Sequence, residues 1–541
     1  MSQTFQDHSL STIQVGQVDL CVSSCFCRKG KKLEKINYSS LTQQMSLSLI
    51  KSFTAAIGLA LLTRICLRSE LLVPRNQIPS HLINQPIHVQ RDLLTPQIGE
   101  ELLRLVETIG ASDGYPTNVV DTSFYHTQHH HIGEAVPAIV EKDGSVICEN
   151  PFLVPSKDRK SCHLAGRIDI GKHLILTGGA RGLREPYSKI ISRVQSFGAY
   201  MFNLNKYPVV SRLFQDQKFL NTALKVCPKN KQILDPFQFN FIIQVPGQTV
   251  ATHIDGVYFK GASRFQFPQW LLAAMKFSGM WEKQFVNQVQ VVGYLHRWEP
   301  NQKNQNQNQE KDQEQEETLE TLETDPYGSF VYWNSKNSTP KRVLPFPLSG
   351  NVVDGSKVVH AASVYRKDAD IPTIVSSIPH WLKKVVEDEE GGEGEGGEGG
   401  EGAAAAAAAN LDGRWTVSNE KDGVLKNYTL NDLRISIVYR ARCFENEKEA
   451  KDFNEKLHGD GGVDGRYTLD EILITFLNDL IEKGYYEKGS MLEDIDRLDL
   501  AMKIMKVYIK YPLPSSPTIP WNYCALGRLA PWLEKPLSWI C

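Results

Sequence analysis

Residues 249–256 contain two side chains that could bind one metal ion. His253 and Asp255 lie two positions apart, after an apolar run at residues 237–250 that predicts a buried strand turning at Pro246-Gly247. In an extended chain, residues i and i+2 point to the same face. A neutral imidazole and a carboxylate placed in this way can hold a cation from one side. A second histidine would complete a facial set of two nitrogens and one oxygen, with three positions open, which is typical of non-haem Fe(II) centres.

A second histidine lies further along the chain. Residues 351–366 predict a turn at Asp354-Gly355, followed by a strand in which two β-branched valines precede His360. The interval from Asp255 is 360 − 255 = 105 residues, which is long enough to hold several strands. His360 is therefore a candidate third ligand, and the alternative interpretation is a hydrogen-bonded core histidine.

Residues 431–444 alternate in character, which predicts a strand. One face would carry Arg434, Ser436, Val438 and Arg440, and the other Leu433, Ile435, Ile437 and Tyr439. An arginine and a serine two residues apart, pointing into a barrel, suit a carboxylate, because the guanidinium can bind it with two N–H groups and the hydroxyl adds a third donor. The alternative is an exposed strand face with solvated arginines.

Taken together, these residues resemble the Fe(II)/2-oxoglutarate-dependent dioxygenase superfamily, and the Pro246-Gly247-Gln248 turn resembles its prolyl 4-hydroxylase-like branch. The resemblance covers about residues 237–444, with a helical lead-in from roughly residue 88. It implies an α+β protein built on a double-stranded β-helix, or jelly-roll. The residues to which it assigns iron binding and catalysis are His253, Asp255 and His360. Arg434, helped by Ser436, would bind the distal carboxylate of 2-oxoglutarate, and Arg366, on the strand of His360, is the alternative anchor.

The same resemblance implies a reaction class. Fe(II), 2-oxoglutarate and O2 would be required, with ascorbate as a further candidate cofactor, and 2-oxoglutarate would be decarboxylated to succinate. Halogenases of this superfamily lack the carboxylate ligand, so Asp255 favours hydroxylation, with a peptidyl or amino-acid side chain as substrate. Two alternatives stay open: an inert β-helix binding scaffold, and a cupin-type metal enzyme that does not use 2-oxoglutarate. The sequence does not identify the substrate, whether protein or small molecule.

Composition limits the possible partners. The 541-residue chain has a formal net charge of −2, which gives no basic footprint for nucleic acid. Its 10 cysteines are scattered, without paired CxxC motifs at zinc spacing, and they do not settle the redox compartment. The length suggests more than one domain or one domain enlarged by insertions.

The N-terminal region, residues 1–87, is expected to be disordered apart from a hydrophobic segment at residues 45–67. Residues 52–63 are uncharged and largely apolar. They are short for a membrane span but have the length of a signal-peptide core. We therefore expect a secretory signal or anchor with membrane attachment, and an organellar transit peptide is the alternative.

The remaining chain divides into a dioxygenase domain at residues 88–444 and a helical C-terminal extension at residues 445–541. Inside the first, we predict a helix at residues 90–111, a hairpin at residues 136–147, one or two helices at residues 189–226, and a helix-prone insert at residues 265–281 that could be core or lid. Low-complexity insertions at residues 301–325 and 387–409 cannot bury enough apolar area to order themselves.

Two other sequence patterns resemble metal-binding sites, but their residues do not favour metal binding. Consecutive histidines at residues 129–131, near His126, cannot converge easily on one ion and are better explained as a solvated loop. Residues 460–471 imitate an EF-hand loop, but Gly462 provides no side-chain oxygen at the third position, so we do not expect calcium to bind. In the C-terminal extension, Thr468 and Glu471 form a capping box that predicts one helix, and a second is expected at residues 492–509.

Overall fold

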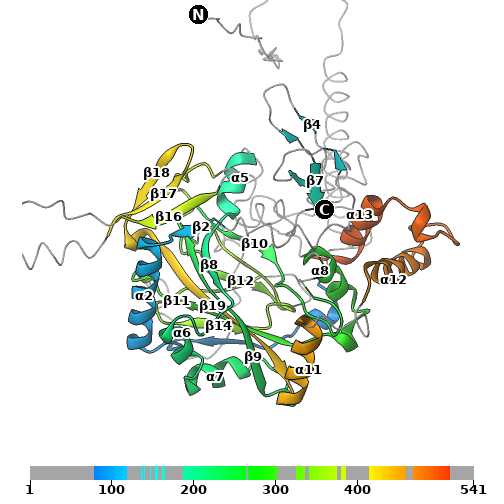
Figure 1. Cartoon of the computed structure of the whole chain (residues 1–541), viewed down its shortest axis with the longest axis horizontal. Helices are drawn as coiled ribbons and strands as arrows, with labels where there is room; N and C mark the ends of the chain where they lie inside the picture. The colour runs from blue at the N-terminus through cyan, green and yellow to red at the C-terminus, as the bar shows by residue number, and fades with distance from the viewer. Residues whose placement is uncertain are drawn as a thin grey trace, which may run out of the picture. The chain divides into compact units, whose positions relative to one another are not determined.

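A computed structural model of the chain describes residues 78–117, 187–263, 266–267, 269–300, 325–335, 340–374, 379–385, 413–458 and 467–511, together with short strands between residues 136 and 164 (Figure 1). All of these belong to one compact unit, Cys66–Cys541. Helices combine with antiparallel sheets, as the expected α+β class requires.

The larger sheet has six strands. Their spatial order is β1 (Ile87–Gln90), β14 (Gly350–Val353), β11 (Gln288–Tyr294), β19 (Arg434–Phe444), β9 (Ile233–Gln244) and β8 (Phe197–Met201). The central strand β19 pairs with β11 on one side and with β9 on the other, so it is fixed along most of its length. β19 is the strand predicted at residues 431–444, and β9 matches the predicted apolar run.

The alternation predicted for β19 is confirmed. Ile435, Ile437 and Tyr439 are fully buried in a cluster that covers one face of the six-stranded sheet. Helices α2 (Pro96–Ala111), α6 (Pro208–Leu213) and α7 (Gln217–Leu224) each contribute residues to that cluster. All three helices are drawn beside this sheet in Figure 1. The opposite face carries Arg434 and Arg440. A small apolar cluster between them is formed by Ile242, Val292, Tyr294 and Val438.

The second sheet has the order β10 (Val250–His253), β15 (Val359–Ala362), β12 (Phe330–Trp333) and β13 (Lys341–Val343). Its outward residues, such as Val331, Trp333 and Val359, pack in one cluster with α8 (Gln269–Ser278), α12 (Leu469–Glu482) and α13 (Arg497–Tyr508). The helix-prone insert is therefore core, since α8 covers the outside of this sheet and is not a lid. Phe330, Tyr332 and His360 point to the opposite side.

The C-terminal helices follow the sequence signals closely. α12 begins after Thr468, whose side chain and that of Glu471 form the expected capping box. The second expected helix is divided into a short turn, η4 (Leu492–Asp494), and α13. An additional helix, α11 (Glu447–His458), packs beside β9 and β19, where the Arg442 guanidinium binds Asp235 and lies over the Phe453 ring.

Several elements differ from the sequence predictions. The helix expected at residues 90–111 begins only at Pro96, because Thr95 caps its N-terminus and residues 87–90 form β1. Residues 189–226 contain the strand β8 as well as α5 (Tyr187–Val194), α6 and α7. Part of the region assigned to a disordered N-terminus is folded: Ile78 and Leu82 are buried in the core, next to η1 (Ser80–Leu82).

A third sheet was not predicted at all. It has the order β18 (Gly423–Tyr428), β17 (Trp415–Asn419), β16 (His380–Lys384) and β2 (Tyr115–Pro116). Between residues 136 and 164, β4 (Ile139–Val140) pairs with β5 (Val146–Ile147). This confirms the predicted hairpin over residues 139–147, whereas residues 136–137 of the prediction pair elsewhere. The strands β3 (Val136–Pro137), β7 (Ser161–Leu164) and β6 (Leu153–Pro155) form a separate small sheet.

Some predictions fall outside the described residues. These concern the hydrophobic segment at residues 45–67, the histidines at 126–131, the calcium-like residues 460–466, and nearly all of both low-complexity insertions. Asp325, placed at the end of the first insertion, is instead buried and accepts a hydrogen bond from the Tyr327 backbone N–H at 2.8 Å. Among the described helices, none has the length and apolar character needed to cross a bilayer.

Candidate metal centre

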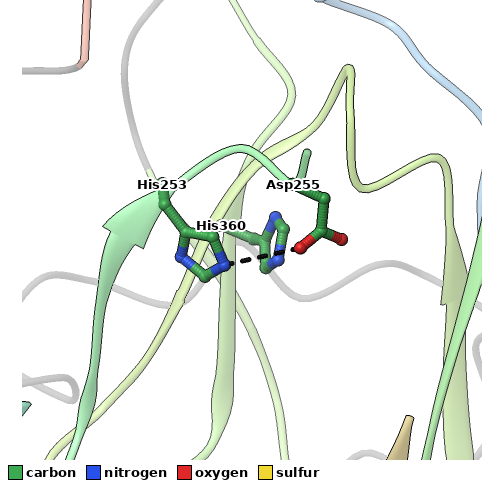
Figure 2. Close-up of side chains that lie close together, drawn as sticks. All are labelled: His253, Asp255 and His360. Atoms are coloured by element: carbon green, nitrogen blue, oxygen red, sulfur yellow. Dashed lines mark ion pairs between the residues drawn. The ribbon is translucent and has the colours of Figure 1, made fainter. Parts of the chain in front are cut away.

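Two neighbouring side chains and one that is distant in sequence meet between the two main sheets. His253, Asp255 and His360 each present one ligand atom, and these atoms all lie within 4.8 Å of one another (Figure 2). The Nε2 atom of His253 lies 3.7 Å from Oδ1 of Asp255, and the two imidazole centroids are 4.4 Å apart. All three residues are buried. The set predicted from the sequence is therefore assembled in one place.

Strand pairing places these ligands. His253 ends β10 and is the direct antiparallel partner of His360 on β15, so their side chains emerge on the same face of the sheet. The register shifts between Val250 and His253, which marks an irregularity of the kind often found beside active sites. Asp255 follows in the loop after β10, where its backbone N–H donates to the Gly355 carbonyl at 2.8 Å.

Backbone carbonyls fix the protonation of both imidazoles. The Nδ1 atom of His253 lies 2.6 Å from the Ala251 oxygen, and that of His360 lies 2.8 Å from the Val358 oxygen. A carbonyl oxygen only accepts, so each Nδ1 must carry the proton. In the neutral ring, Nε2 is then left with the lone pair that a metal ligand requires.

The charge state of the cluster also suits a cation. Burial and the neighbouring His253 lower the pKa of His360 to about 4, so this imidazole is neutral at pH 7. Burial alone would raise the pKa of the Asp255 carboxyl, but Arg440 and the His253 imidazole outweigh it and hold that pKa well below its usual range. The His360 nitrogen and the Asp255 oxygen are therefore in the charge states that metal ligands need.

Asp255 sits in a closely fitting recess. Its Oδ2 atom is buried without a hydrogen-bond partner, as is Oε1 of Gln290. Gly355 lies directly against both: a Cβ added there would come within 2.9 Å of the Asp255 Cγ atom and closer still to the two oxygens. Because no side chain fits at position 355, the backbone itself holds the carboxylate with Oδ1 toward His253.

The predicted anchor Arg434 is buried on the inward face of β19. Its Nη1 donates to Oε1 of Gln244 at 2.6 Å, and its guanidinium lies 5.2 Å from the centroid of the Tyr294 ring. The Tyr294 hydroxyl accepts a hydrogen bond from Asn351 at 2.9 Å. Ser436 is buried on the same face, where its hydroxyl donates to the Ile242 carbonyl at 3.1 Å. The structure therefore places Arg434 and Ser436 on one wall.

Several donors around Arg434 are buried without a hydrogen-bond partner. Besides Nε of Arg434 itself, they are Nε2 of Gln244, Oγ of Ser329 and the hydroxyl of Tyr365. Gly328, next to Ser329, lies against both arginine and tyrosine: a Cβ there would be 2.9 Å from Cδ of Arg434 and 3.1 Å from Cβ of Tyr365. Unpaired buried polar groups are costly, so this group of donors fits an acceptor such as a carboxylate.

The alternative anchor, Arg366, lies elsewhere. Its side chain is 41% exposed and its Nη1 binds Oδ1 of Asp432 at 2.7 Å. Arg366 also has φ +44°, so its backbone is in the left-handed region and the side chain leaves the strand direction of His360. Of the two arginines, only Arg434 is buried beside unpartnered donors.

Sequence reasoning missed three contributors to this region. Arg440 was placed on the correct strand face but given no role, although its Nη2 donates to Oδ1 of Asp255. Tyr294 and Tyr365 were not singled out, because an aromatic residue on an apolar strand has no local signal that separates a ligand contact from core packing. For Arg440 a signal existed, since it shares a face with Arg434.

Comparisons with known proteins find similar solved structures but no related sequence. The sequence matches no family model and no curated protein. Matching solved structures include a Pseudomonas putida prolyl-4-hydroxylase (8% identity, 66% of this chain and 94% of that chain, TM-score 0.25), the alpha-ketoglutarate-dependent epimerase SnoN of nogalamycin biosynthesis (8%, 71% and 92%, 0.27), and a Trichoplax adhaerens prolyl hydroxylase in complex with a hypoxia-inducible factor peptide (9%, 70% and 91%, 0.25).

These neighbours are 2-oxoglutarate–Fe(II) oxygenases, the superfamily that the site residues resemble. All three identities are below 10% and all three TM-scores are below 0.5.

Proposed function

We propose that this protein is an Fe(II)- and 2-oxoglutarate-dependent oxygenase with a double-stranded β-helix core, acting as a hydroxylase. One observation carries the proposal. The buried cluster of His253, Asp255 and His360 and the buried, unpartnered donors around Arg434 both lie between the six-stranded sheet and the second sheet. Two neutral nitrogens and a carboxylate suit Fe(II), and the donors around Arg434 suit a carboxylate.

Each group in the chain has a distinct task in this proposal. His253, Asp255 and His360 would hold the metal ion on one face and leave its other positions open. Arg434 would bind the distal carboxylate of 2-oxoglutarate, with Ser436 on the same wall. When bound, the metal, 2-oxoglutarate and O2 would supply the oxidising chemistry, with succinate as a product.

Apart from Ser436, the wall between the two ends of the site is apolar. Ile242, Val292 and Val438 pack there with Tyr294 and form the strip of sheet that separates Arg434 from Arg440. Such a wall excludes water from the co-substrate, which strengthens the ionic contacts at both ends and protects a reactive oxidant.

The direct test measures succinate. Full-length protein is incubated with Fe(II), 2-oxoglutarate and O2, and succinate is quantified by mass spectrometry. Release that is abolished in His253→Ala, and retained in His88→Ala on the edge strand β1, supports the proposal. An absence of succinate from a folded wild-type protein that still binds partners would favour a scaffold. Metal binding that is indifferent to 2-oxoglutarate would favour a cupin-type enzyme.

The substrate class proposed is a peptidyl or amino-acid side chain, by resemblance to the prolyl 4-hydroxylase-like branch. A comparison of proteins and metabolites from cells with the active protein and with His253→Ala would reveal mass gains of one oxygen atom. Gains confined to lipids or nucleotides would contradict this class. Ascorbate is proposed only as an added reductant, and its effect on succinate yield can be measured in the same assay.

We also propose that the protein resides in the secretory pathway. A disulfide joins Cys227, just after α7, to Cys443 in β19, and disulfides of this kind persist mainly in oxidising compartments. This supports the interpretation of residues 45–67 as a signal or membrane anchor. A reporter fused to residues 45–75 that stays in the cytosol would contradict the proposal, and entry into an organelle other than the endoplasmic reticulum would favour a transit peptide.

A further inference from the structure

Arg440 places a positive charge on the metal-binding carboxylate. Its Nη2 donates to Oδ1 of Asp255, the same oxygen that lies 3.7 Å from Nε2 of His253. The side chains of Arg440 and Asp255 are only 16% and 6% exposed, so water screens this ion pair poorly. The Nε atom of Arg440 is buried without a hydrogen-bond partner.

Asp255 is also held by contacts that do not involve Arg440. Its backbone N–H is held by the Gly355 carbonyl at 2.8 Å, and the Gly355 backbone lies against Oδ2 with no room for a side chain. These contacts come from the turn between β14 and β15, not from β19. The guanidinium therefore contributes charge to a carboxylate whose position is also restricted by the turn at Gly355.

That charge changes the electrostatics of the whole centre. With both imidazoles neutral, as metal binding requires, the three ligands together carry one negative charge, and Arg440 brings the sum to zero. A divalent cation then enters a site that attracts it less. Once the cation is bound, the surplus positive charge is larger than it would be without Arg440, and it favours an anionic ligand beside the metal.

Strand β19 provides a second cation on the same face. Arg434 lies six residues before Arg440, which is three strand periods of two residues. Both side chains therefore point to the inward side, with Val438 between them. A ligand lying along this strip therefore meets one guanidinium at each end. A molecule with two carboxylates matches that arrangement better than one with a single carboxylate.

We propose that Arg440 sets the charge selectivity of this centre: it weakens binding of the bare divalent cation and strengthens binding of a dianionic co-substrate to the loaded site. The inference rests on the proposed function, because it assumes that His253, Asp255 and His360 bind the metal. Arg440 would contribute through its charge and not as a structural support of Asp255.

The test uses Mn(II), which avoids turnover, and full-length protein freed of metal at pH 7.5. Calorimetry gives the Kd of Mn(II), and then the Kd of 2-oxoglutarate for the Mn(II)-loaded protein without O2. For Arg440→Met we expect Mn(II) to bind about tenfold more tightly and 2-oxoglutarate about tenfold more weakly. Arg440→Gln, which keeps an N–H donor but no charge, should give both shifts if Arg440→Met does not fold.

Two control variants separate charge from structure. Arg440→Lys keeps the positive charge and should keep both constants within about threefold of wild type. Arg366→Met removes a guanidinium from the outside of the same unit, where it pairs with Asp432, and should change neither constant.

Opposite shifts of the two constants are the signature of the proposed role. If both neutral variants weaken Mn(II) binding as well as 2-oxoglutarate binding, Arg440 is a structural support and the proposal is refuted. Unchanged constants refute it equally, while succinate release that depends on His253 would leave the proposed function intact. A wild-type protein that binds no Mn(II) would refute both.

Discussion

Replacing Gly355 by alanine should disable the metal centre through one methyl group. The added Cβ would lie 2.9 Å from the Asp255 Cγ atom and nearer still to Oδ2 and to Oε1 of Gln290, although real Cβ atoms essentially never approach another atom within 3.0 Å. The carboxylate must therefore move by about 1 Å to restore normal contact distances. Metal–ligand distances tolerate only about 0.2 Å, so we expect the affinity for Mn(II) to fall by roughly 100-fold or more.

The same substitution should cost little in folding. Overpacking of a close-packed site costs about 1–3 kcal/mol, part of which is offset because alanine restricts the unfolded chain more than glycine does. Calorimetric titration with Mn(II) and thermal unfolding of the metal-free protein measure the two effects separately. Gly413→Ala is the matched control, because a Cβ there meets only the flexible end of the Lys384 side chain.

One result would refute this reasoning: a folded Gly355→Ala protein that binds Mn(II) with wild-type affinity. It would mean that the Asp255 carboxylate either has room to move without loss or does not bind the metal. A loss of Mn(II) binding together with a large loss of stability, above about 3 kcal/mol, would instead show that position 355 supports the fold.

Three further predictions concern other parts of the molecule. Arg434→Met should weaken 2-oxoglutarate binding by about 100-fold while leaving the Mn(II) affinity unchanged, since a charge-assisted bidentate contact is worth about 3 kcal/mol; a similar loss in Arg366→Met would contradict the assignment. Reduction of the Cys227–Cys443 disulfide, which spans 216 residues, should lower the free energy of unfolding by roughly 5 kcal/mol at most. Chemical denaturation with and without reductant measures this change in stability. An unchanged denaturation midpoint would show that the two cysteines are not joined. Burial lowers the pKa of His296 to about 3, so the folded state resists its protonation, and stability should fall as the pH drops below about 6.5, by about 3 kcal/mol at pH 4; His296→Phe should flatten that part of the profile, and an equally steep profile would assign the loss to other groups.

The sequence predicts the parts of this site that depend on local spacing. His253 and Asp255 lie two residues apart, and the alternation of β19 follows from one face packing on helices and the other lining the interior. The sequence of β19 keeps alternating apolar and polar residues, because a shift of the strand by one residue would point its charged side chains into the apolar cluster. Because only one face of β19 packs on the helices, the sequence alone predicts the direction in which Arg434 and Ser436 point.

Pairings between distant segments are much harder to predict. Arg440 lies in β19, and its partner Asp255 lies 185 residues away in the loop after β10, so only the packing of the two sheets brings them together. The disulfide has the same character, because scattered cysteines do not reveal their connectivity. Strand β8 has a different cause: its five residues include glycine and alanine, show no clear alternation, and form a strand by pairing with β9.

The interval of 74 residues between His360 and Arg434 illustrates why separation in sequence says little about separation in the fold. The third sheet occupies much of it. The chain leaves β16 after Lys384 and returns in β17 at Trp415, and these two residues are cross-strand partners. A connection between such closely spaced ends can lengthen at small entropic cost, since doubling a loop costs only about 0.6 kcal/mol. The low-complexity insertion at residues 387–409 falls within this connection, where added length changes neither strand that carries the site. Its Glu, Gly and Ala residues can therefore vary in number while β15 and β19 keep His360 and Arg434 in place.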